Sequence, residues 1–330
     1  MESASRDIKI FSGSAHEKFT KSICSTLGIQ MSGRKIFRFS DGEIGLSLQE
    51  SVRGTDAFII QPTCAPVNEN LMELLVIIDA MQRASAYRIN VVLPYFGYAR
   101  QDRKARAREP ITAKLVANLL QQAGADRVIT ADLHAGQIQG FFDIPMDHLT
   151  GIPLLASHFK RILKNALQER RVIVVAPDLG GVVRARRFAE QIDTELAIID
   201  KRRSHDVANQ SRVIEIIGEV RGKVAILVDD IIDTGGSIVN AANALLEYGA
   251  ESVYSCAVHG VLSGDAIERI NNSSMVEMVL TDTIPLSSEK HTEKITVMSI
   301  APLFAEAIRR IHLDHSISIL FQPKPRRREG

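Results

Sequence analysis

The amino-acid sequence predicts an α/β fold with two domains, each built on a largely parallel β-sheet flanked by helices. Apolar runs of about four to eight residues alternate with helix-period stretches, a pattern typical of strands that helices bury on both faces. The chain has 330 residues, and at about 150 residues per domain this length favours two domains. A Gly and a Pro in DHLTGIP, residues 147–153, interrupt the pattern. We therefore expect one domain over residues 1–150 and another over 151–330.

The expected elements follow from these runs in chain order. The apolar runs that we expect to form strands are residues 8–11, 57–60, 91–94, 128–131, 172–176, 196–200, 224–228, 253–258 and 278–280. The amphipathic segments between them, which we expect to form helices, include residues 68–84, 111–123 and 238–248. Each of these segments ends near a glycine or a turn residue, as helices commonly do.

Composition and charge narrow the class of protein. Lys and Arg total 40 against 39 Asp and Glu, so no overall field attracts nucleic acid or an anionic membrane. No apolar run approaches the ~18 residues that a membrane span needs. The cysteines Cys24, Cys64 and Cys256 lie far apart and lack CxxC spacing, which argues against a disulfide framework or a zinc site. We expect a cytoplasmic protein that binds neither nucleic acid nor a membrane.

The strongest chemical motif is VAILVDDIIDTGGS, residues 224–237. An apolar strand leads into two adjacent carboxylates, and a Thr-Gly-Gly-Ser turn then opens a helix. Ligands bind at the carboxyl ends of parallel strands, where helix N-termini present unpaired N–H groups to anions. We expect Gly235 and Gly236 to let the backbone approach a phosphate closely, while Thr234 and Ser237 add hydroxyl donors.

The adjacent carboxylates of this motif, Asp229 and Asp230, are placed to accept hydrogen bonds from sugar hydroxyls. The alternative is an ordinary connection from strand to helix, in which the glycines only make a turn and the Asp residues cap the helix. The whole string resembles the ribose-5-phosphate loop of the type I phosphoribosyltransferase fold family. That resemblance is specific for the fold family and does not choose between an enzyme that consumes phosphoribosyl diphosphate and one that makes it.

Further motifs resemble those of ribose-phosphate pyrophosphokinases. They are FSDGE (39–43), PYFGYARQDRK (94–104), DLHAGQIQGFFDIPMD (132–147), APDLGGVVRAR (176–186) and DKRR (200–203), and the resemblance covers nearly the whole chain. It implies an enzyme that uses Mg²⁺ and moves the β,γ-diphosphate of ATP onto the C1 hydroxyl of ribose 5-phosphate. A nucleobase phosphoribosyltransferase is a weaker alternative, because it has no use for FSDGE and YARQDRK. A non-catalytic regulatory relative that associates with the active synthetase is the other alternative.

The resemblance also implies roles for individual residues. The expected ATP contacts, in the N-terminal half, are Asp41, Glu43, Arg100, Gln101 and His134. The expected ribose 5-phosphate contacts, in the C-terminal half, are Arg203, Asp229, Asp230, Asp233, Thr234, Gly235, Gly236 and Ser237. The expected metal site comprises His134, Asp178 and Asp132. Because Mg²⁺ prefers oxygen ligands, we favour Asp178 over His134, and Asp132 is the least favoured of the three. Lys201 and Arg203 are the expected catalytic side chains, because positioning and charge neutralisation dominate phosphoryl transfer.

Two further properties are implied in the same way. Members of the resembled family form homo-oligomers, commonly hexamers. A control site for inorganic phosphate and ADP is expected at Ser51, Arg53, Ser316 and Ser318, where hydroxyl and N–H donors and one guanidinium can hold a phosphate. The alternative is that these residues only cap and pair at the surface.

Overall fold

The structure is a computed structural model of the chain and describes residues 6–202 and 213–320. It divides into two compact units. Unit 1 comprises Met1–Thr150, Thr283–Pro285 and Ser299–Gln322, and unit 2 comprises Gly151–Asp282, Leu286–Met298 and Pro323–Gly330. The sequence prediction assigned all of 151–330 to one domain, whereas the segment Ser299–Gln322 is grouped with unit 1.

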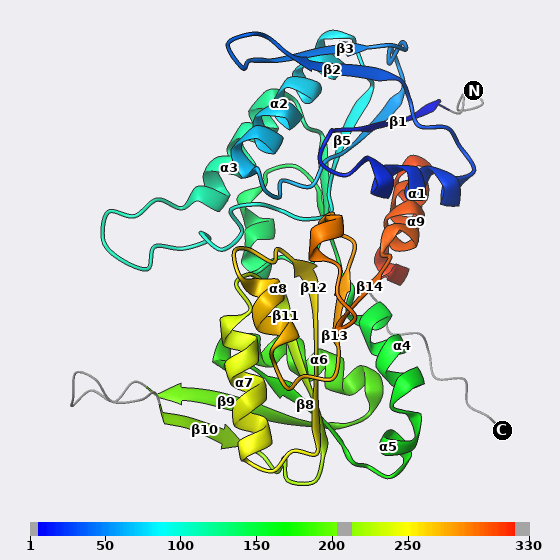
Figure 1. Cartoon of the computed structure of the whole chain (residues 1–330). Coiled ribbons are helices and arrows are strands. Elements are labelled where there is room, and N and C mark those ends of the chain that lie inside the picture. Colours follow the sequence, from blue (N-terminus) through cyan, green and yellow to red (C-terminus); the bar gives the residue numbers. More distant parts are fainter. Residues whose placement is uncertain (1–5, 203–212, 321–330) are drawn as a thin grey trace, which may run out of the picture. The chain divides into compact units, whose positions relative to one another are not determined.

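Unit 1 is built on a parallel five-stranded sheet in the order β1-β4-β5-β6-β7 (Figure 1). Its strands are β1 (Ile8–Ser12), β4 (Asp56–Ile60), β5 (Arg88–Leu93), β6 (Arg127–Ala131) and β7 (Met146–Leu149). The helices α2 (Val67–Arg83) and α3 (Thr112–Ala123) pack on this sheet through buried side chains such as Leu74, Ile78 and Val116. A separate antiparallel hairpin, β2 (Arg34–Arg38) and β3 (Ile44–Leu48), carries the FSDGE turn.

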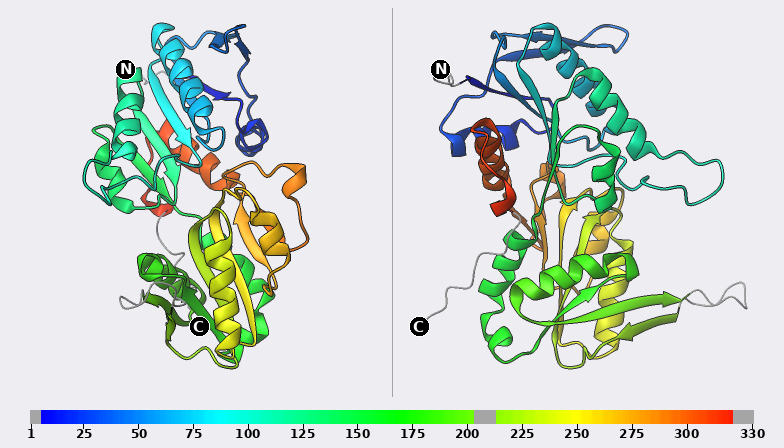
Figure 2. Two further views of the ribbon diagram at one scale, coloured as in Figure 1. Left: turned by 60° about the vertical axis from the view of Figure 1, so that its left-hand side comes forward. Right: turned by 180° about the vertical axis from the view of Figure 1, so that it is seen from behind.

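The C-terminal helix α9 (Ala301–His312) lies beside α1 (Glu17–Leu27) within unit 1 (Figures 1 and 2). The buried rings of Phe19 and Phe304 meet edge to face with their centroids 5.6 Å apart. Each helix is amphipathic, and pairing the two apolar faces removes both from water. This packing is why the last helix joins the N-terminal unit.

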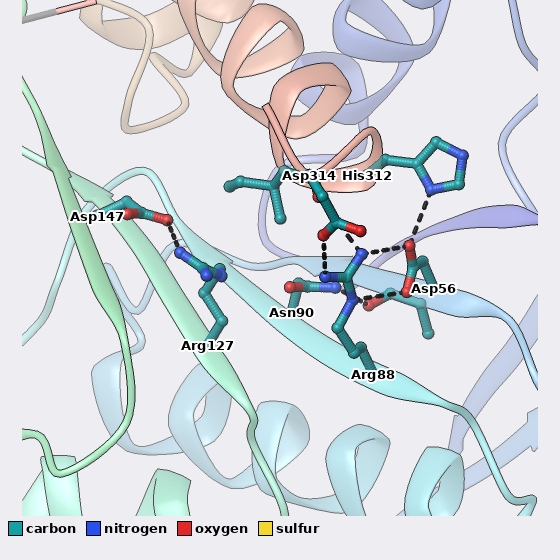
Figure 3. A network of polar contacts seen from close by, with 9 residues as sticks. Asp56, Arg88, Asn90, Arg127, Asp147, His312 and Asp314 are labelled. Carbon is teal, nitrogen blue, oxygen red and sulfur yellow. Dashed lines mark hydrogen bonds and ion pairs between the residues drawn. The ribbon is translucent and has the colours of Figure 1, made fainter. Parts of the chain in front are cut away.

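A polar network ties the end of α9 to β4 and β5 (Figure 3). Arg88 donates to both oxygens of Asp56, at 2.8 and 2.7 Å, and to Asp314 at 2.8 Å and the carbonyl of Ile311 at 3.3 Å. His312 Nδ1 lies 2.9 Å from the same Asp56 carboxylate, which is fully buried. Burial alone would raise the pKa of Asp56, but the hydrogen bonds from Arg88 and His312 outweigh it and lower that pKa.

Unit 2 is built on a seven-stranded sheet in the order β10-β9-β8-β11-β12-β13-β14, in which every neighbouring pair is parallel except β9 and β10. The strands are β8 (Val172–Ala176), β9 (Glu195–Arg202), β10 (Val213–Ile217), β11 (Val224–Ile232), β12 (Ser252–Gly260), β13 (Met278–Thr281) and β14 (Ile295–Met298). The helices are α4 (Ile152–Ile162), α5 (Lys164–Gln168), α6 (Val182–Ile192), α7 (Gly236–Glu247) and α8 (Ala266–Asn271). The β9–β10 hairpin projects past the neighbouring strands (Figure 2).

The structure confirms the predicted fold class, because both units are α/β with parallel central strands. Each apolar run that was predicted as a strand overlaps one, and the predicted helices at 68–84, 111–123 and 238–248 correspond to α2, α3 and α7. The elements outside that set include β2 (RKIFR), which is mostly basic, β3 (IGLSL), which a glycine and a serine interrupt, and β10 (VIEII), which a glutamate interrupts. Among the residues described, no helix has the length and apolar content to cross a bilayer.

Candidate functional site

The turn after β11 opens helix α7 as the sequence predicted. Gly235 has φ 73°, in the left-handed region that glycine adopts without strain, and its carbonyl accepts the N–H of Val239 at 3.0 Å. Helix α7 begins at Gly236, and its N-cap residue, Gly235, has no side chain with which to cap the first turn. The leading N–H groups of α7 therefore face a position suited to an anion.

The two glycines of this turn have different roles. Gly235 requires glycine for its backbone angle, whereas Gly236 has ordinary helical backbone. A Cβ atom added to Gly236 would meet only the Nη1 atom of Arg269 at 3.6 Å and Oγ1 of Thr234 at 4.0 Å. The space above Gly236 is thus open to a ligand, and a side chain there would compete with that ligand rather than with the fold.

Helix α8 and the loop that precedes it hold the backbone of this turn. Arg269 Nη1 donates to the carbonyl of Thr234 at 3.1 Å, and Ser263 N donates to the carbonyl of Asp233 at 3.0 Å. A Cβ atom at Gly235 would lie 3.5 Å from the carbonyl oxygen of Ala266. These contacts fix the backbone of the turn, and the sequence prediction did not anticipate them because α8 comes later in the chain, after α7 and β12.

The acidic pair lies toward the end of β11 and is held by an arginine from α6. Arg184 Nη1 is 3.1 Å from Oδ1 of Asp229, and Arg184 Nη2 is 3.1 Å from Oδ1 of Asp230. The side chains are 16%, 26% and 4% exposed for Arg184, Asp229 and Asp230 respectively, so the cluster is mostly withdrawn from water. Asp229 Oδ1 also accepts the N–H of Asp230 at 2.8 Å.

The environment of Asp229 perturbs its ionisation. Burial and the neighbouring Asp230 raise the pKa of Asp229 to about 7, and the charge of Arg184 opposes that rise. Arg184 belongs to the predicted APDLGGVVRAR motif, but the sequence prediction gave it no role. The available signal was the pair itself, because two adjacent carboxylates at a buried strand end require a counter-charge.

Asp178 follows β8 at the start of the turn that leads into α6. Its Oδ1 accepts the N–H of Gly181 at 2.9 Å, so this carboxylate caps the short 3-10 turn Leu179–Gly181. The residue is exposed, and the contact engages only one of its carboxylate oxygens. Asp178 can therefore hold the turn with one oxygen while offering the other to a ligand.

Asp132 and His134 follow β6 in unit 1. Asp132 is buried and has φ 33°, a strained angle for a residue with a side chain, and its Oδ1 accepts the hydroxyl of Thr150 at 2.9 Å. His134 is exposed, two residues further along the chain. Across residues 6–202 and 213–320, no group of three or more His, Cys, Asp or Glu side chains forms a cation site.

Apart from His134, which follows β6, the residues expected to contact ATP lie on two exposed loops of unit 1. In the β2–β3 turn, Asp41 Oδ1 accepts the N–H of Glu43 at 3.1 Å, which orients both acidic residues, and the ring of Phe39 beside them is 54% exposed. After β5, Gln101 Oε1 accepts the hydroxyl of Thr112 at 2.5 Å, so its NH₂ group keeps its two donors outside this contact. Arg100 is exposed next to it.

The residues of the expected control site make local contacts within unit 1. Ser316 and Ser318 bring their hydroxyl oxygens to 2.8 Å, and Arg310 donates to the carbonyl of Ser316 at 2.9 Å. Ser51 accepts the N–H of Arg53 at 3.4 Å. These contacts are what surface capping alone would produce, so the control site stays a prediction.

Of the two expected catalytic residues, the structure describes only Lys201. The backbone of Lys201 lies in β9 opposite Ile214 of β10. Arg203 lies outside the described residues, so its expected role rests on the sequence.

Comparisons with known proteins match the chain over most of its length. The family model described as the N-terminal domain of ribose phosphate pyrophosphokinase matches residues 8–124. A second model, described as a phosphoribosyl synthetase-associated domain, matches residues 203–322. Together they span parts of both units.

Curated relatives and a solved structure agree with these matches. The chain is 55% identical to a ribose-phosphate pyrophosphokinase of Clostridium perfringens, over 98% of the chain and 100% of the relative. It is 54% identical to that of Bacillus subtilis, over 96% of the chain and 98% of the relative. The crystal structure of phosphoribosylpyrophosphate synthetase from Mycobacterium smegmatis aligns with a TM-score of 0.88 at 42% identity, covering 94% of the chain and all of that structure.

Proposed function

The chain belongs to the ribose-phosphate pyrophosphokinase family and is a ribose-phosphate diphosphokinase, and from this premise we propose how its own residues serve the reaction. The C1 hydroxyl oxygen of ribose 5-phosphate attacks the β-phosphorus of ATP in line. The bond from that phosphorus to the α,β-bridging oxygen breaks, AMP leaves, and phosphoribosyl diphosphate forms for nucleotide biosynthesis.

The observation that carries the proposal is the sugar-phosphate site at the end of β11. The N-terminus of α7 presents N–H groups above the open face of Gly236, which suits the 5-phosphate. Asp229 and Asp230 stand on the same strand end, where their carboxylates accept hydrogen bonds from the ribose hydroxyls. Asp233, Thr234, Gly235 and Ser237 complete the proposed site.

The proposed nucleotide site uses Asp41, Glu43, Arg100, Gln101 and His134. Arg100 supplies charge for the phosphates, and the amide NH₂ of Gln101 supplies neutral donors. The exposed ring of Phe39 beside Asp41 provides a surface for base stacking. All of these residues lie in unit 1, so the proposal assigns ATP mainly to that unit and the sugar to unit 2.

We propose Mg²⁺ as the cofactor, with Asp178, His134 and Asp132 as the protein's contribution. Mg²⁺ usually takes one or two carboxylates and fills its remaining positions with phosphate oxygens and water, so a compact protein cage is not required. The exposed Asp178 carboxylate, with one oxygen engaged by Gly181, fits this mode of binding. When bound, the ion neutralises negative charge on the phosphate oxygens.

Charge neutralisation by the protein is assigned to Lys201 and Arg203. Lys201 offers a compact charge and Arg203 a planar fork, which together suit a diphosphate that gains negative charge as AMP leaves. The proposal includes a homo-oligomer, as a hexamer, and control by phosphate and ADP at Ser51, Arg53, Ser316 and Ser318. A cytoplasmic location is supported by Cys24, Cys64 and Cys256, all of which are free thiols.

The test is a mass-spectrometric assay with ATP, Mg²⁺ and ribose 5-phosphate. The expected products are AMP and phosphoribosyl diphosphate in equal amounts. With ATP labelled by ¹⁸O at the γ-phosphoryl group, the label is expected in the diphosphate of the sugar product. Release of ADP or inorganic phosphate instead would contradict the proposed transfer. Absence of turnover together with tight binding to an active relative would favour a regulatory role.

A further inference from the structure

Arg184 of α6 reaches the acidic pair of the sugar site, and we infer that it is a positioning residue for ribose 5-phosphate. Its guanidinium holds the carboxylates of Asp229 and Asp230 in the orientation in which they accept hydrogen bonds from the ribose hydroxyls. The inference rests on the proposed function, because it concerns the same sugar site.

The guanidinium of Arg184 contacts the two carboxylates through two different nitrogen atoms. Each terminal nitrogen of Arg184 serves a different carboxylate, Nη1 at 3.1 Å from Asp229 and Nη2 at 3.1 Å from Asp230. A planar guanidinium holds two oxygens in a fixed relation, which a lysine ammonium cannot do. Arg184 Nη1 and the N–H of Asp230 both donate to Oδ1 of Asp229. Neither contact uses Oδ2 of Asp229, which can therefore accept a hydrogen bond from a sugar hydroxyl.

The negative charges of Asp229 and Asp230 require a cationic partner. Two adjacent carboxylates that are only 26% and 4% exposed repel each other, and burial disfavours the ionised form of both. The groups that face Asp229 are Asp230 of its own strand, Arg184 of α6 and the buried thiol of Cys256 on β12. Arg184 is the cation of this set, and it favours the ionised carboxylate that accepts hydrogen bonds. A protonated carboxyl would present a donor where the sugar also presents donors.

The position of Arg184 follows from the helix that carries it. The buried side chains of Ala185, Phe188 and Ile192 seat α6 on unit 2. The N-terminal end of α6 continues from the turn that Asp178 caps through Gly181. One rigid helix therefore connects the turn proposed to meet Mg²⁺ with the carboxylates proposed to meet the sugar.

The experiment compares Arg184→Met with Arg184→Lys and with Arg187→Met, a matched control at an exposed position of the same helix. Thermal unfolding monitored by circular dichroism verifies that each variant folds. Affinity for ribose 5-phosphate is measured by calorimetry on the full chain, and KM values for ribose 5-phosphate and ATP are measured by turnover. The same Arg184→Met change is then made in the Asp229→Asn, Asp230→Asn background, where no carboxylate is left to position.

We expect Arg184→Met to weaken ribose 5-phosphate binding roughly 10- to 100-fold, the loss typical of hydrogen bonds to charged groups. The KM for ATP should change less than about threefold, Arg187→Met should match the wild type, and Arg184→Lys should recover part of the loss, since it restores charge without the fork. In the double-Asn background, Arg184→Met should add less than about a threefold effect, because the two changes act through one unit.

Three outcomes would overturn the inference: unchanged sugar affinity in folded Arg184→Met, an equal rise of both KM values, or the full loss persisting in the double-Asn background. The last would mean that Arg184 contacts the substrate directly. If Arg184→Met fails to fold, a folded Arg184→Lys variant with wild-type affinity for ribose 5-phosphate would contradict the positioning role of Arg184. A wild-type protein that binds ribose 5-phosphate without forming product refutes the proposed reaction alone, since the calorimetry still decides the role of Arg184.

Discussion

The fold raises the pKa of the Asp229 carboxyl to a value near neutral pH. Burial and Asp230 together place its pKa at about 7 despite the opposing charge of Arg184. For folding, a carboxyl with a raised pKa contributes stability at low pH that is lost as the pH rises through about 7. For sugar binding the sign is opposite, because only the ionised form accepts hydrogen bonds on both oxygens.

We therefore expect the KM for ribose 5-phosphate to rise as the pH falls below about 7. The measurement is steady-state KM against pH, between about pH 6 and 8.5, a range that brackets that value. The phosphate of the substrate also titrates near pH 6, so Asp229→Asn serves as the control for that effect. The asparagine variant should bind the sugar more weakly and lose the pH dependence centred near 7. An identical pH profile in Asp229→Asn would exclude Asp229 as its source.

Asp178 allows metal binding to be separated from local folding. Asp178→Asn keeps an amide oxygen that can accept the N–H of Gly181, and so retains the cap, but it removes the charge that attracts Mg²⁺. We expect a higher apparent Mg²⁺ requirement with an unchanged melting temperature. Asp178→Ala removes both functions and should also lose about 1 kcal/mol of stability. A Mg²⁺ titration curve in Asp178→Asn that overlays the wild type would remove this carboxylate from the proposed ligands.

At the scale of elements, β11, the turn after it and α7 were predictable because all their signals are local. An apolar run, an acidic pair and a Thr-Gly-Gly-Ser turn occur in one continuous stretch. The contributions of Arg184 and Arg269 were not predictable from local sequence, because these side chains reach the site from α6 and α8. Only the folded sheet brings those helices to the end of β11. Local sequence thus identified the residues proposed to face the ligands, while tertiary packing supplied the residues that hold them.

Substitutions at the two glycines of the turn should distinguish backbone strain at Gly235 from steric blocking of the proposed phosphate position at Gly236. Gly235→Ala places a side chain on a left-handed backbone and should lower stability by about 1–2 kcal/mol as well as weaken sugar binding. Gly236→Val has ordinary backbone and open space, so it should leave the melting temperature nearly unchanged while it blocks ribose 5-phosphate binding. Thermal melts and calorimetry provide both readouts. Retained sugar affinity in Gly236→Val would show that the turn does not hold the phosphate.

At the scale of the whole molecule, the sequence predicted the fold class and most of the central strands. It did not predict that the chain re-enters unit 1 near its C-terminus. The α9 sequence shows an amphipathic helix but not the partner for its apolar face, and that partner, α1, is almost the length of the chain away. Pairing across such a distance is decided by the packed core and by the network around Asp56.

This network should make a measurable contribution to stability. Arg88→Met leaves the buried Asp56 without its main partner, and loss of one partner from a buried pair typically costs about 3–5 kcal/mol. Arg83→Met breaks an exposed pair with Asp79, which water screens, and should therefore cost much less stability than Arg88→Met. Denaturant unfolding of both variants gives the comparison. Equal stability losses would mean that the Asp56 network does not anchor α9.

The return of the last helix to unit 1 has a consequence for how the protein is made. A ribosome releases residues 1–150 long before residues 299–322, so the nascent first unit waits for α9 while residues 151–298 are synthesised. Until then, the Phe19 face of α1 has no Phe304 to cover it, and Asp56 lacks the hydrogen bond from His312. A stop codon or proteolytic cut within α9 would therefore damage the unit encoded first.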